Sequence, residues 1–385
     1  MKRLIASFSL VLLFVACQPS GVGHSAYYPG AGDDWERRAP EQVGMDPAAL
    51  QEAIEFAIAN ENPAPHDLAI ALSQSREPFN ELIGPTKVRG GPAGLVLRRG
   101  YIVAEWGDIK RVDMTFSVTK SFLSTVTGLA WDRGLIHDLA DPVKDYFPSE
   151  HFESEHNSEI TWGQMLRQTT EWEGTLWGKP DWADRPEGDE PAAWPDRELK
   201  NPGERWKYND VRVNLLALAV LNVWREPLPE VLKANIMDPI GASNTWRWHG
   251  YENSWVTIDG LRMQSVSGGG HWGGGMFINT TDLARFGLLS LRRGNWKGRQ
   301  LLSEEWIEMA TTPTDLNKSY GFMNWFLNTE RTLLPSSPEN AFFHAGGGDN
   351  LVYVSPDHDL VVVVRWLERR GRDEFFRRVL EAVRS

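Results

Sequence analysis

The chain has 385 residues, which is enough for one large folded unit of two lobes. An apolar fraction of 41% and a charged fraction of 24% are those of an ordinary globular protein and argue against a disordered chain. The formal net charge of −12 and the lack of a dense basic stripe exclude nucleic acid as the expected partner.

The N-terminus predicts an exported protein. Lys2 and Arg3 precede an apolar run over residues 4–15, which is the pattern of a secretory signal and is too short to span a membrane. We therefore expect residues 1–16 to be a signal peptide, and we expect the mature chain to act in the cell envelope or periplasm.

Cys17 is the single cysteine of the chain, so it cannot form an intramolecular disulfide. Residues 14–17 resemble the cleavage site of a bacterial lipoprotein, which implies that Cys17 becomes the lipidated first residue and anchors the protein to a membrane. Ordinary cleavage near Ala16, with a free Cys17, is the alternative. The stretch that follows is rich in Gly, Ser and Pro and predicts a flexible tether over residues 17–39.

Residues 40–385 predict one domain to which both ends of the chain contribute. The pattern predicts a helix at 47–59 capped by Asp46, a hairpin at 94–106, strands near 276–278, 341–345, 351–355 and 360–367, and helices at 281–292 and 373–384. Residues 131–265 hold many Trp, Pro and acidic residues and are expected to form a mostly helical second lobe. Strands at both ends with a helical insert predict an α/β (α+β) fold, in which helices flank an antiparallel sheet.

Ser117 and Lys120 lie three residues apart at the start of a predicted helix that Gly134 ends. This spacing places both side chains on one face, where the lysine amine can help to remove the serine proton. The pattern Ser-x-x-Lys also occurs by chance, so a solvated pair in the first turn is the alternative.

A second motif leads into the apolar run 211–223, which predicts a buried helix. Tyr208 lies just before this helix, where a nearby lysine can lower the pKa of the phenol and let it shuttle protons. An aromatic plug over the helix end is the alternative for Tyr208. Asp210 comes directly before the helical run and is expected to be its N-cap.

A third motif, Phe-His-Ala-Gly-Gly-Gly at residues 343–348, predicts a strand beside the nucleophile. Such a strand can bind the substrate along its edge, with His344, Gly346 and Gly347 as substrate-binding residues. The glycines let the substrate approach closely and let a backbone N–H point at a developing oxyanion. A structural histidine is the alternative for His344.

Together these motifs resemble the serine β-lactamase and penicillin-binding-protein-like family, on its class C β-lactamase, D-peptidase and esterase side. Their order and separations match, and the resemblance covers roughly residues 40–385. It implies that Ser117 is the acylating nucleophile and that Lys120 and Tyr208 share the work of general base and acid. It also implies an oxyanion hole at the N–H groups of Ser117 and Gly347.

Two residues depart from the pattern of this family. Asp210 stands where the family more often has asparagine, so we expect its part in orienting the substrate to be altered. His344 stands where β-lactamases have a lysine, and a histidine is mostly neutral at pH 7. Both departures predict poor β-lactam turnover and an ester or amide substrate with little fixed negative charge near the scissile bond.

The sequence therefore predicts a serine hydrolase that cleaves an ester or amide through an acyl-enzyme on Ser117. A D-peptidase or transpeptidase acting on cell-wall peptides, a true β-lactamase, and an inactive envelope binding protein are the alternatives. The expected partner is a small molecule or peptide. No cofactor or metal is expected, since the chain has no His-Glu-x-x-His motif and no phosphate-binding loop.

Overall fold

The computed structural model describes residues 26–188 and 190–384. The predicted signal peptide at 1–16 and the predicted lipidation site at Cys17 lie outside the described residues. Within the described ranges, no helix has the length and apolar character needed to cross a membrane.

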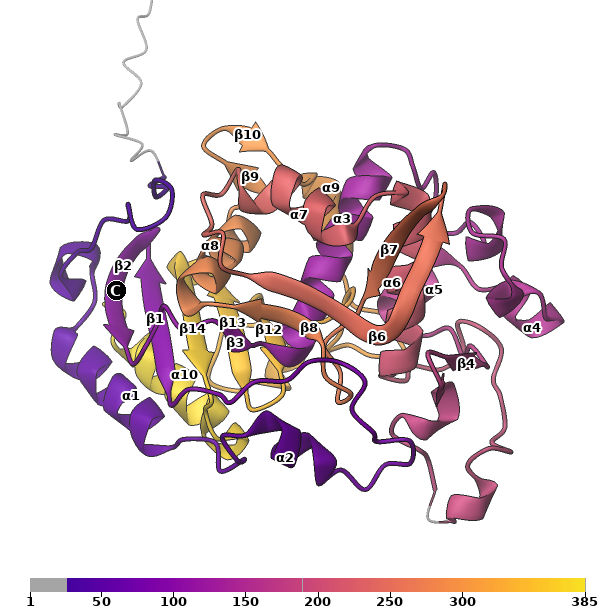
Figure 1. Cartoon of the computed structure of the whole chain (residues 1–385). Helices are drawn as coiled ribbons and strands as arrows, with labels where there is room; N and C mark the ends of the chain where they lie inside the picture. The colour runs from indigo at the N-terminus through magenta and orange to yellow at the C-terminus, as the bar shows by residue number, and fades with distance from the viewer. Residues whose placement is uncertain (1–25, 189, 385) are drawn as a thin grey trace, which may run out of the picture.

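A six-stranded antiparallel sheet forms the centre of the fold, in the order β11-β12-β13-β14-β1-β2 (Figure 1). Its strands are β1 (Ala93–Arg98), β2 (Tyr101–Trp106), β11 (Phe326–Leu327), β12 (Phe342–Gly346), β13 (Asn350–Ser355) and β14 (Leu360–Arg365). The N-terminal strand β1 pairs with the C-terminal strand β14, with Leu95 opposite Val363. The predicted antiparallel sheet assembled from both ends of the chain is confirmed.

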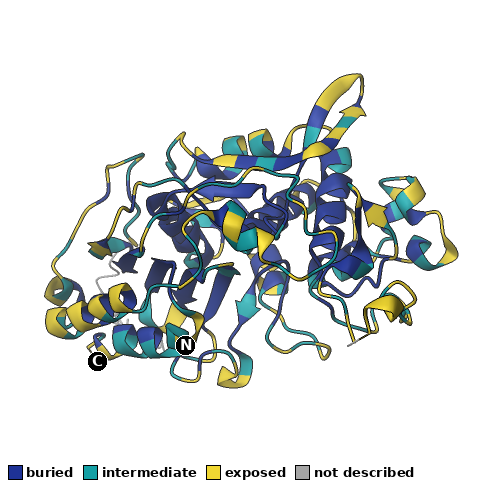
Figure 2. Cartoon of the chain, turned by 60° about the horizontal axis from the view of Figure 1, so that its bottom comes forward, coloured by how far each residue is buried: buried dark blue, intermediate teal, exposed yellow. Residues whose placement is uncertain are grey.

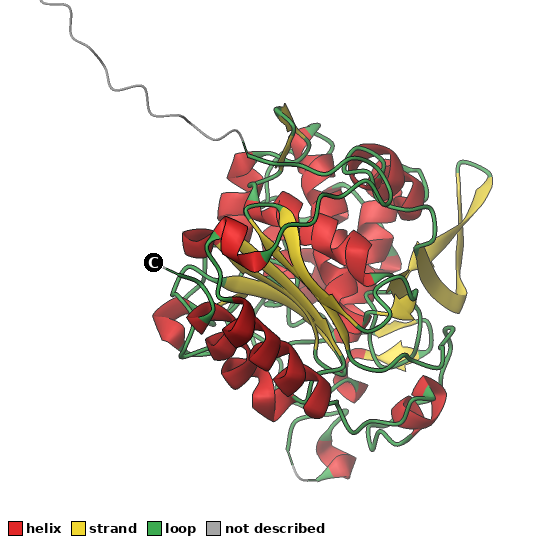
Figure 3. Cartoon of the chain, turned by 90° about the vertical axis from the view of Figure 1, so that its left-hand side faces the viewer, coloured by secondary structure: helices red, strands yellow, loops and turns green. Residues whose placement is uncertain are grey.

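Helices cover both faces of this sheet (Figure 3). On one face, Val362 and Val364 pack with residues of α1 (Pro47–Ala59) and α10 (Arg372–Glu381). On the other face, Val361 and Val363 pack with residues of α3 (Thr119–Asp132) and α8 (Thr280–Leu291). Successive side chains of a strand point to opposite faces, so this apolar strand is buried on both sides. Figure 2 shows the central strands buried and the outer helices exposed on their far sides.

Five helices, α1, α3, α6, α8 and α10, agree closely with predicted ranges, and the shorter ones among the described residues were not predicted individually. The helices are α1 (Pro47–Ala59), α2 (Leu68–Ser73), α3 (Thr119–Asp132), α4 (Glu155–Ser158), α5 (Trp162–Arg167), α6 (Asp210–Trp224), α7 (Leu228–Leu232), α8 (Thr280–Leu291), α9 (Glu304–Ala310) and α10 (Arg372–Glu381). Asp46 caps α1 as predicted, because its side chain accepts hydrogen bonds from the N–H groups of Ala48 and Ala49.

The second lobe contains a long hairpin that the sequence analysis missed. Its strands β6 (Arg247–Ile258) and β7 (Leu261–Val266) join β8 (Gly275–Ile278) and β3 (Asp113–Met114) in a four-stranded sheet. Asp259 and Gly260 form the turn with φ angles of 54° and 78°, and Asp-Gly is a strong hairpin signal. The expected mostly helical lobe over 131–265 is therefore corrected. Four short strands complete the fold: β4 (Thr175–Leu176), β5 (Lys179–Pro180), β9 (Asn295–Trp296) and β10 (Arg299–Gln300).

The described part of the expected tether, residues 26–39, is packed against the domain instead of free. Trp35 is buried, and its Nε1 donates a hydrogen bond to the carbonyl of Gly100 at 2.8 Å. Arg37 forms a bridge with Ile102 of the edge strand β2. A large apolar side chain and an open strand edge explain this ordering, so the predicted flexible tether over 17–39 is wrong for this part.

Candidate active site

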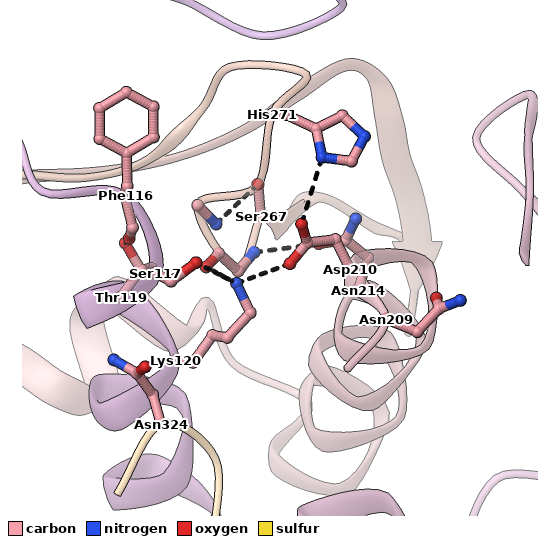
Figure 4. A network of polar contacts seen from close by, with 12 residues as sticks. Phe116, Ser117, Thr119, Lys120, Asn209, Asp210, Asn214, Ser267, His271 and Asn324 are labelled. Atoms are coloured by element: carbon pink, nitrogen blue, oxygen red, sulfur yellow. Dashed lines mark hydrogen bonds and ion pairs between the residues drawn. The ribbon is translucent and has the colours of Figure 1, made fainter. Parts of the chain in front are cut away.

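Ser117 and Lys120 lie at the junction between the sheet and the second lobe. Ser117 belongs to a 3-10 turn, η2 (Phe116–Val118), which leads directly into α3. The Nζ atom of Lys120 donates a hydrogen bond to Ser117 Oγ at 2.8 Å (Figure 4). Ser117 is half-buried and lines a cavity of about 420 Å³, whereas Lys120 is fully buried. The structure therefore brings the predicted pair into direct contact beside an open cavity.

Lys120 has three acceptors around its amine. Its Nζ lies 2.8 Å from Ser117 Oγ, 3.1 Å from the carbonyl oxygen of Gly268 and 2.7 Å from Asp210 Oδ1. The first two contacts are hydrogen bonds that Nζ donates, and the contact with Asp210 is an ion pair. The contacts hold Lys120 against Ser117 and leave the amine no freedom to turn away.

Phe116, just before Ser117, adopts a strained backbone conformation with a φ of 50°. Its ring packs on Trp366, and the end of β12 lies close behind it. A Cβ at Gly346 would meet the Thr115 carbonyl oxygen at 2.1 Å, so only glycine permits this approach. The approach brings Gly347 and Ser117 to the same cavity, as the expected oxyanion hole requires.

Tyr208 lines the cavity beside Ser117. Its ring lies between two cations, 5.1 Å from Lys120 Nζ and 4.8 Å from the guanidinium carbon of Arg185. Burial and the charge of Asp210 raise the pKa of the Tyr208 phenol well above its usual value, although Arg185 and a hydrogen bond with Ser117 oppose them. The expected lowering of this pKa is wrong, and Tyr208 lies beside Ser117 as a neutral phenol.

Asp210 is not the N-cap of α6. Asn209 takes that position, and its side chain accepts a hydrogen bond from the N–H of Arg212 at 3.0 Å. One step further along the chain, Asp210 points the other way and contacts Lys120, Arg185 and His271 (Figure 4). Burial would raise the pKa of Asp210, but the charges of Lys120 and Arg185 outweigh it and hold the pKa well below its usual range. Asp210 is therefore a charged partner of Lys120, buried away from any substrate.

His344 lies outside the cavity, which corrects its predicted role in substrate binding. Its neighbours Phe343 and Ala345 line the cavity, and strand alternation turns His344 to the opposite face. There its Nδ1 lies 2.9 Å from Ser121 Oγ, and burial lowers the pKa of the imidazole to about 3. The structural alternative for His344 is the one that the geometry supports, while Gly346 and Gly347 do lie at the cavity.

The cavity is lined by aromatic and cationic side chains that lie next to one another: Trp206, Tyr208, Phe326, Phe343, Arg185, Arg369 and Arg372. The guanidinium carbon of Arg185 lies 4.8 Å from the Tyr208 ring centre, and that of Arg372 lies 5.3 Å from the Phe343 ring centre. Arg372 is paired with Asp349 at 2.7 Å, whereas Arg369 is exposed. The sequence analysis missed these arginines because nothing near them in the sequence marks them. Their presence removes the argument, based on His344, that the site lacks a permanent positive charge.

Glu77, Asp184 and His271 are the described residues that come nearest to a metal-binding set. Their ligand atoms lie within 4.8 Å of one another. However, Arg185 Nη1 lies 2.5 Å from Asp184 Oδ1, and His271 Nε2 lies 2.9 Å from Glu77 Oε2. Asp184 is therefore paired with Arg185 and Glu77 with His271, so the group is better described as an ion-pair cluster.

Comparisons with known proteins agree with this geometry. The sequence model of the family described as Beta-lactamase matches residues 111–382. A candidate D-alanyl-D-alanine carboxypeptidase of Escherichia coli O157:H7 is 24% identical over 42% of this chain, and one of Escherichia coli K12 is 23% identical over the same share. The match covers 45% of each relative, so the chain spans less than half the length of these curated relatives.

Solved structures share the fold at low identity. A penicillin-binding-protein homologue from Caulobacter crescentus has 15% identity and a TM-score of 0.57, and the match covers 88% of this chain and 99% of that one. EstCE1, a hydrolase with promiscuous acyltransferase activity, has 14% identity and a TM-score of 0.57 over the same shares of the two chains. Because the family model matches residues 111–382, which is more than half of the chain, the chain belongs to the family described as Beta-lactamase.

Proposed function

We propose that this protein is a serine hydrolase that cleaves a carboxylic ester or amide through an acyl-enzyme on Ser117. The observation that carries the proposal is the contact of 2.8 Å between Lys120 Nζ and Ser117 Oγ at the edge of a cavity. Tyr208 lines the same cavity as Ser117, so both candidate proton carriers lie beside the nucleophile.

The reaction has two steps. In the first, Ser117 Oγ bonds to the substrate carbonyl carbon, the bond to the leaving group breaks, and the serine proton passes through Lys120 and Tyr208 to the leaving group. In the second, water adds to the acyl-enzyme, releases the acid and returns a proton to Ser117. The N–H groups of Ser117 and Gly347 would stabilise the oxyanion in both steps.

A peptidase is the second candidate function. Arg369 places an exposed cation at the cavity, which suits a substrate with a free carboxylate, and the curated relatives are candidate carboxypeptidases. A peptide with a free C-terminal carboxylate that is cleaved much faster than its C-terminal amide would favour this activity. Faster cleavage of a neutral ester than of either peptide would favour an esterase, and rapid opening of a cephalosporin would favour a β-lactamase.

Labelling with a fluorophosphonate probe tests the proposal and separates it from an inactive binding protein. Wild-type protein should be labelled on Ser117, as mapped by mass spectrometry, and Ser117→Ala should lose labelling and ester turnover by several orders of magnitude. Ser124→Ala is the matched control, because Ser124 is buried on the same helix and its hydroxyl has no partner among the described residues. Unchanged turnover in Ser117→Ala would refute the proposal.

We also propose that the protein is exported and anchored through Cys17, which rests on the sequence of residues 1–17. Cells grown with a labelled fatty acid should yield a labelled, membrane-associated protein. Cys17→Ser should remove the label and release the protein or block its processing. A wild-type protein that is unlabelled and soluble would contradict the anchor.

A further inference from the structure

An ionic cluster lies behind the Ser117–Lys120 pair, and we call it the site cluster: Lys120, Arg185, His271, Glu77, Asp184 and Asp210. Asp210 lies at its centre. One of its oxygens, Oδ1, is 2.7 Å from Lys120 Nζ. The other, Oδ2, is 3.1 Å from Arg185 Nη1. It also lies 3.5 Å from His271 Nδ1 (Figure 4). The same carboxylate therefore bridges the lysine of the reaction and two further cations.

Asp210 alone would hinder acyl transfer. A carboxylate 2.7 Å from Nζ stabilises the ammonium form of Lys120, because opposite charges attract strongly in a buried site. A lysine that moves protons during acyl transfer must release and regain one in each cycle. A neutral asparagine at this position would not hold the proton in this way. The negative charge of Asp210 thus opposes the release of a proton from Lys120 unless positive charges nearby offset it.

Arg185 and His271 supply the offsetting charge at the second oxygen of Asp210. Arg185 is held in place by Asp184, at 2.5 Å. His271 belongs to the glycine-rich loop 268–275, and its other nitrogen lies 2.9 Å from Glu77 Oε2. A Cβ at Gly270 would lie 2.7 Å from Asp210 Cγ, so the loop sits directly on Asp210 and aims His271 at it.

We propose that Arg185 and His271 are positioning residues whose positive charges neutralise Asp210, so that Lys120 can exchange its proton during acyl transfer. This inference rests on the proposed function of the site. It requires that turnover depend on the charge of residue 271 more than on its shape. It also requires that this dependence disappear when Asp210 has no charge.

The charge of His271 is sensitive to pH. The charged groups that face or border its ring are Asp210, Asp184, Glu77, Arg185 and Lys120. Burial alone would lower the pKa of His271, but its contacts with Asp210 and Glu77 outweigh burial and raise the pKa to about 9. The positive charge is therefore present at neutral pH and is lost as the pH rises through about 9, where we expect turnover to fall.

A double-mutant cycle on the full-length protein tests the proposal. We would measure kcat/KM for p-nitrophenyl acetate against pH in the wild type, His271→Gln, Asp210→Asn and the double variant. His271→Gln should lower kcat/KM about tenfold at neutral pH, because the negative charge of Asp210 beside Lys120 is then offset less completely. In the Asp210→Asn background the same change should have an effect within about twofold.

Further variants separate charge from structure. His271→Lys keeps the positive charge and should regain most of the activity that His271→Gln loses, which a purely structural role would not allow. Arg185→Gln and Arg185→Lys compare loss and retention of the positive charge at the second cation, Arg185. If thermal unfolding shows that His271→Gln is not folded, these two variants test the proposal in its place. Equal losses in both Asp210 backgrounds, or complete inactivity of Asp210→Asn, would overturn the proposal. If the proposed function itself were wrong, Ser117→Ala would keep its turnover. That result is different from any outcome of the double-mutant cycle at His271 and Asp210.

Discussion

Two buried ionic clusters start from the first turn of α6 and lie on different sides of it. Asp210 leads into the site cluster, whereas Arg212, two residues later, leads into a second group that we call the scaffold cluster: Arg212, Arg197, Arg205, Glu171 and Asp181. Both contain carboxylates with almost no exposed surface, and both contain several arginine contacts. Buried charge by itself therefore does not distinguish a reactive site from a structural one.

The contacts that each cluster makes distinguish the reactive site from the structural cluster. In the scaffold cluster, Arg212 reaches Glu171 at 3.1 Å and Asp181 at 3.0 Å, and Arg197 reaches the same two carboxylates. These pairs fasten two loop segments to α6 and include none of the residues that line the cavity. In the site cluster, Lys120 contacts Ser117 at the cavity. What marks the site is contact between a buried charge and an accessible nucleophile.

The largest effect that would sharpen this comparison is on stability. Arg212→Met removes one partner from two buried carboxylates, Glu171 and Asp181, and should lower the free energy of unfolding by about 3–5 kcal/mol. The turnover of the molecules that remain folded should change little, because the site cluster is intact. Urea unfolding followed by tryptophan fluorescence, together with kcat per folded molecule, measures both quantities.

The control for this variant is Arg225→Met, which breaks an exposed ion pair with Asp259 and should cost at most about 1 kcal/mol. A loss of turnover in Arg212→Met as large as in His271→Gln would break the comparison. It would mean that the scaffold cluster also governs the proton on Lys120.

The parts of this molecule that could be predicted from sequence are those determined by local spacing. A three-residue step at a helix start brings Ser117 and Lys120 together whatever surrounds them. The apolar run at 360–367 predicts a buried strand, and the short link within 94–106 predicts a hairpin, so the central sheet follows from both ends of the chain.

Long-range contacts could not be predicted in this way. Arg185 and His271 meet Asp210 from distant segments, and nothing beside them in the sequence indicates the contact. Asp210 was predicted to be the N-cap of α6 and His344 to bind the substrate, and each prediction is wrong by one position along the chain. The cap lies at Asn209, and the alternation of β12 turns position 344 away from the cavity. A motif in the right place does not determine which way its side chains point.

A smaller effect that would sharpen the comparison is the dependence of stability on pH, because Glu171 of the scaffold cluster and His271 of the site cluster should lose their contributions at opposite ends of the scale. In the scaffold cluster, burial would raise the pKa of Glu171, but Arg205 and Arg212 outweigh it and lower the pKa to about 2 from 4.5. A lowered carboxyl pKa stabilises the fold above pH 4.5, and that contribution is lost as the pH falls toward 2.

The opposite sign holds for His271 of the site cluster, since its pKa is raised from 6.5 to about 9. Its contribution is complete below pH 6.5 and is lost as the pH rises through 9. Each contribution is at most about 3 kcal/mol. Both variants can be compared with the wild type by urea unfolding from pH 3 to pH 10. Glu171→Gln should destabilise the protein at neutral pH but progressively less below pH 4.5. His271→Gln should also destabilise it at neutral pH but progressively less toward pH 9. If both variants instead lost their effect at the same end of the scale, the two clusters would be one coupled network, and the separation drawn at the first turn of α6 would be wrong.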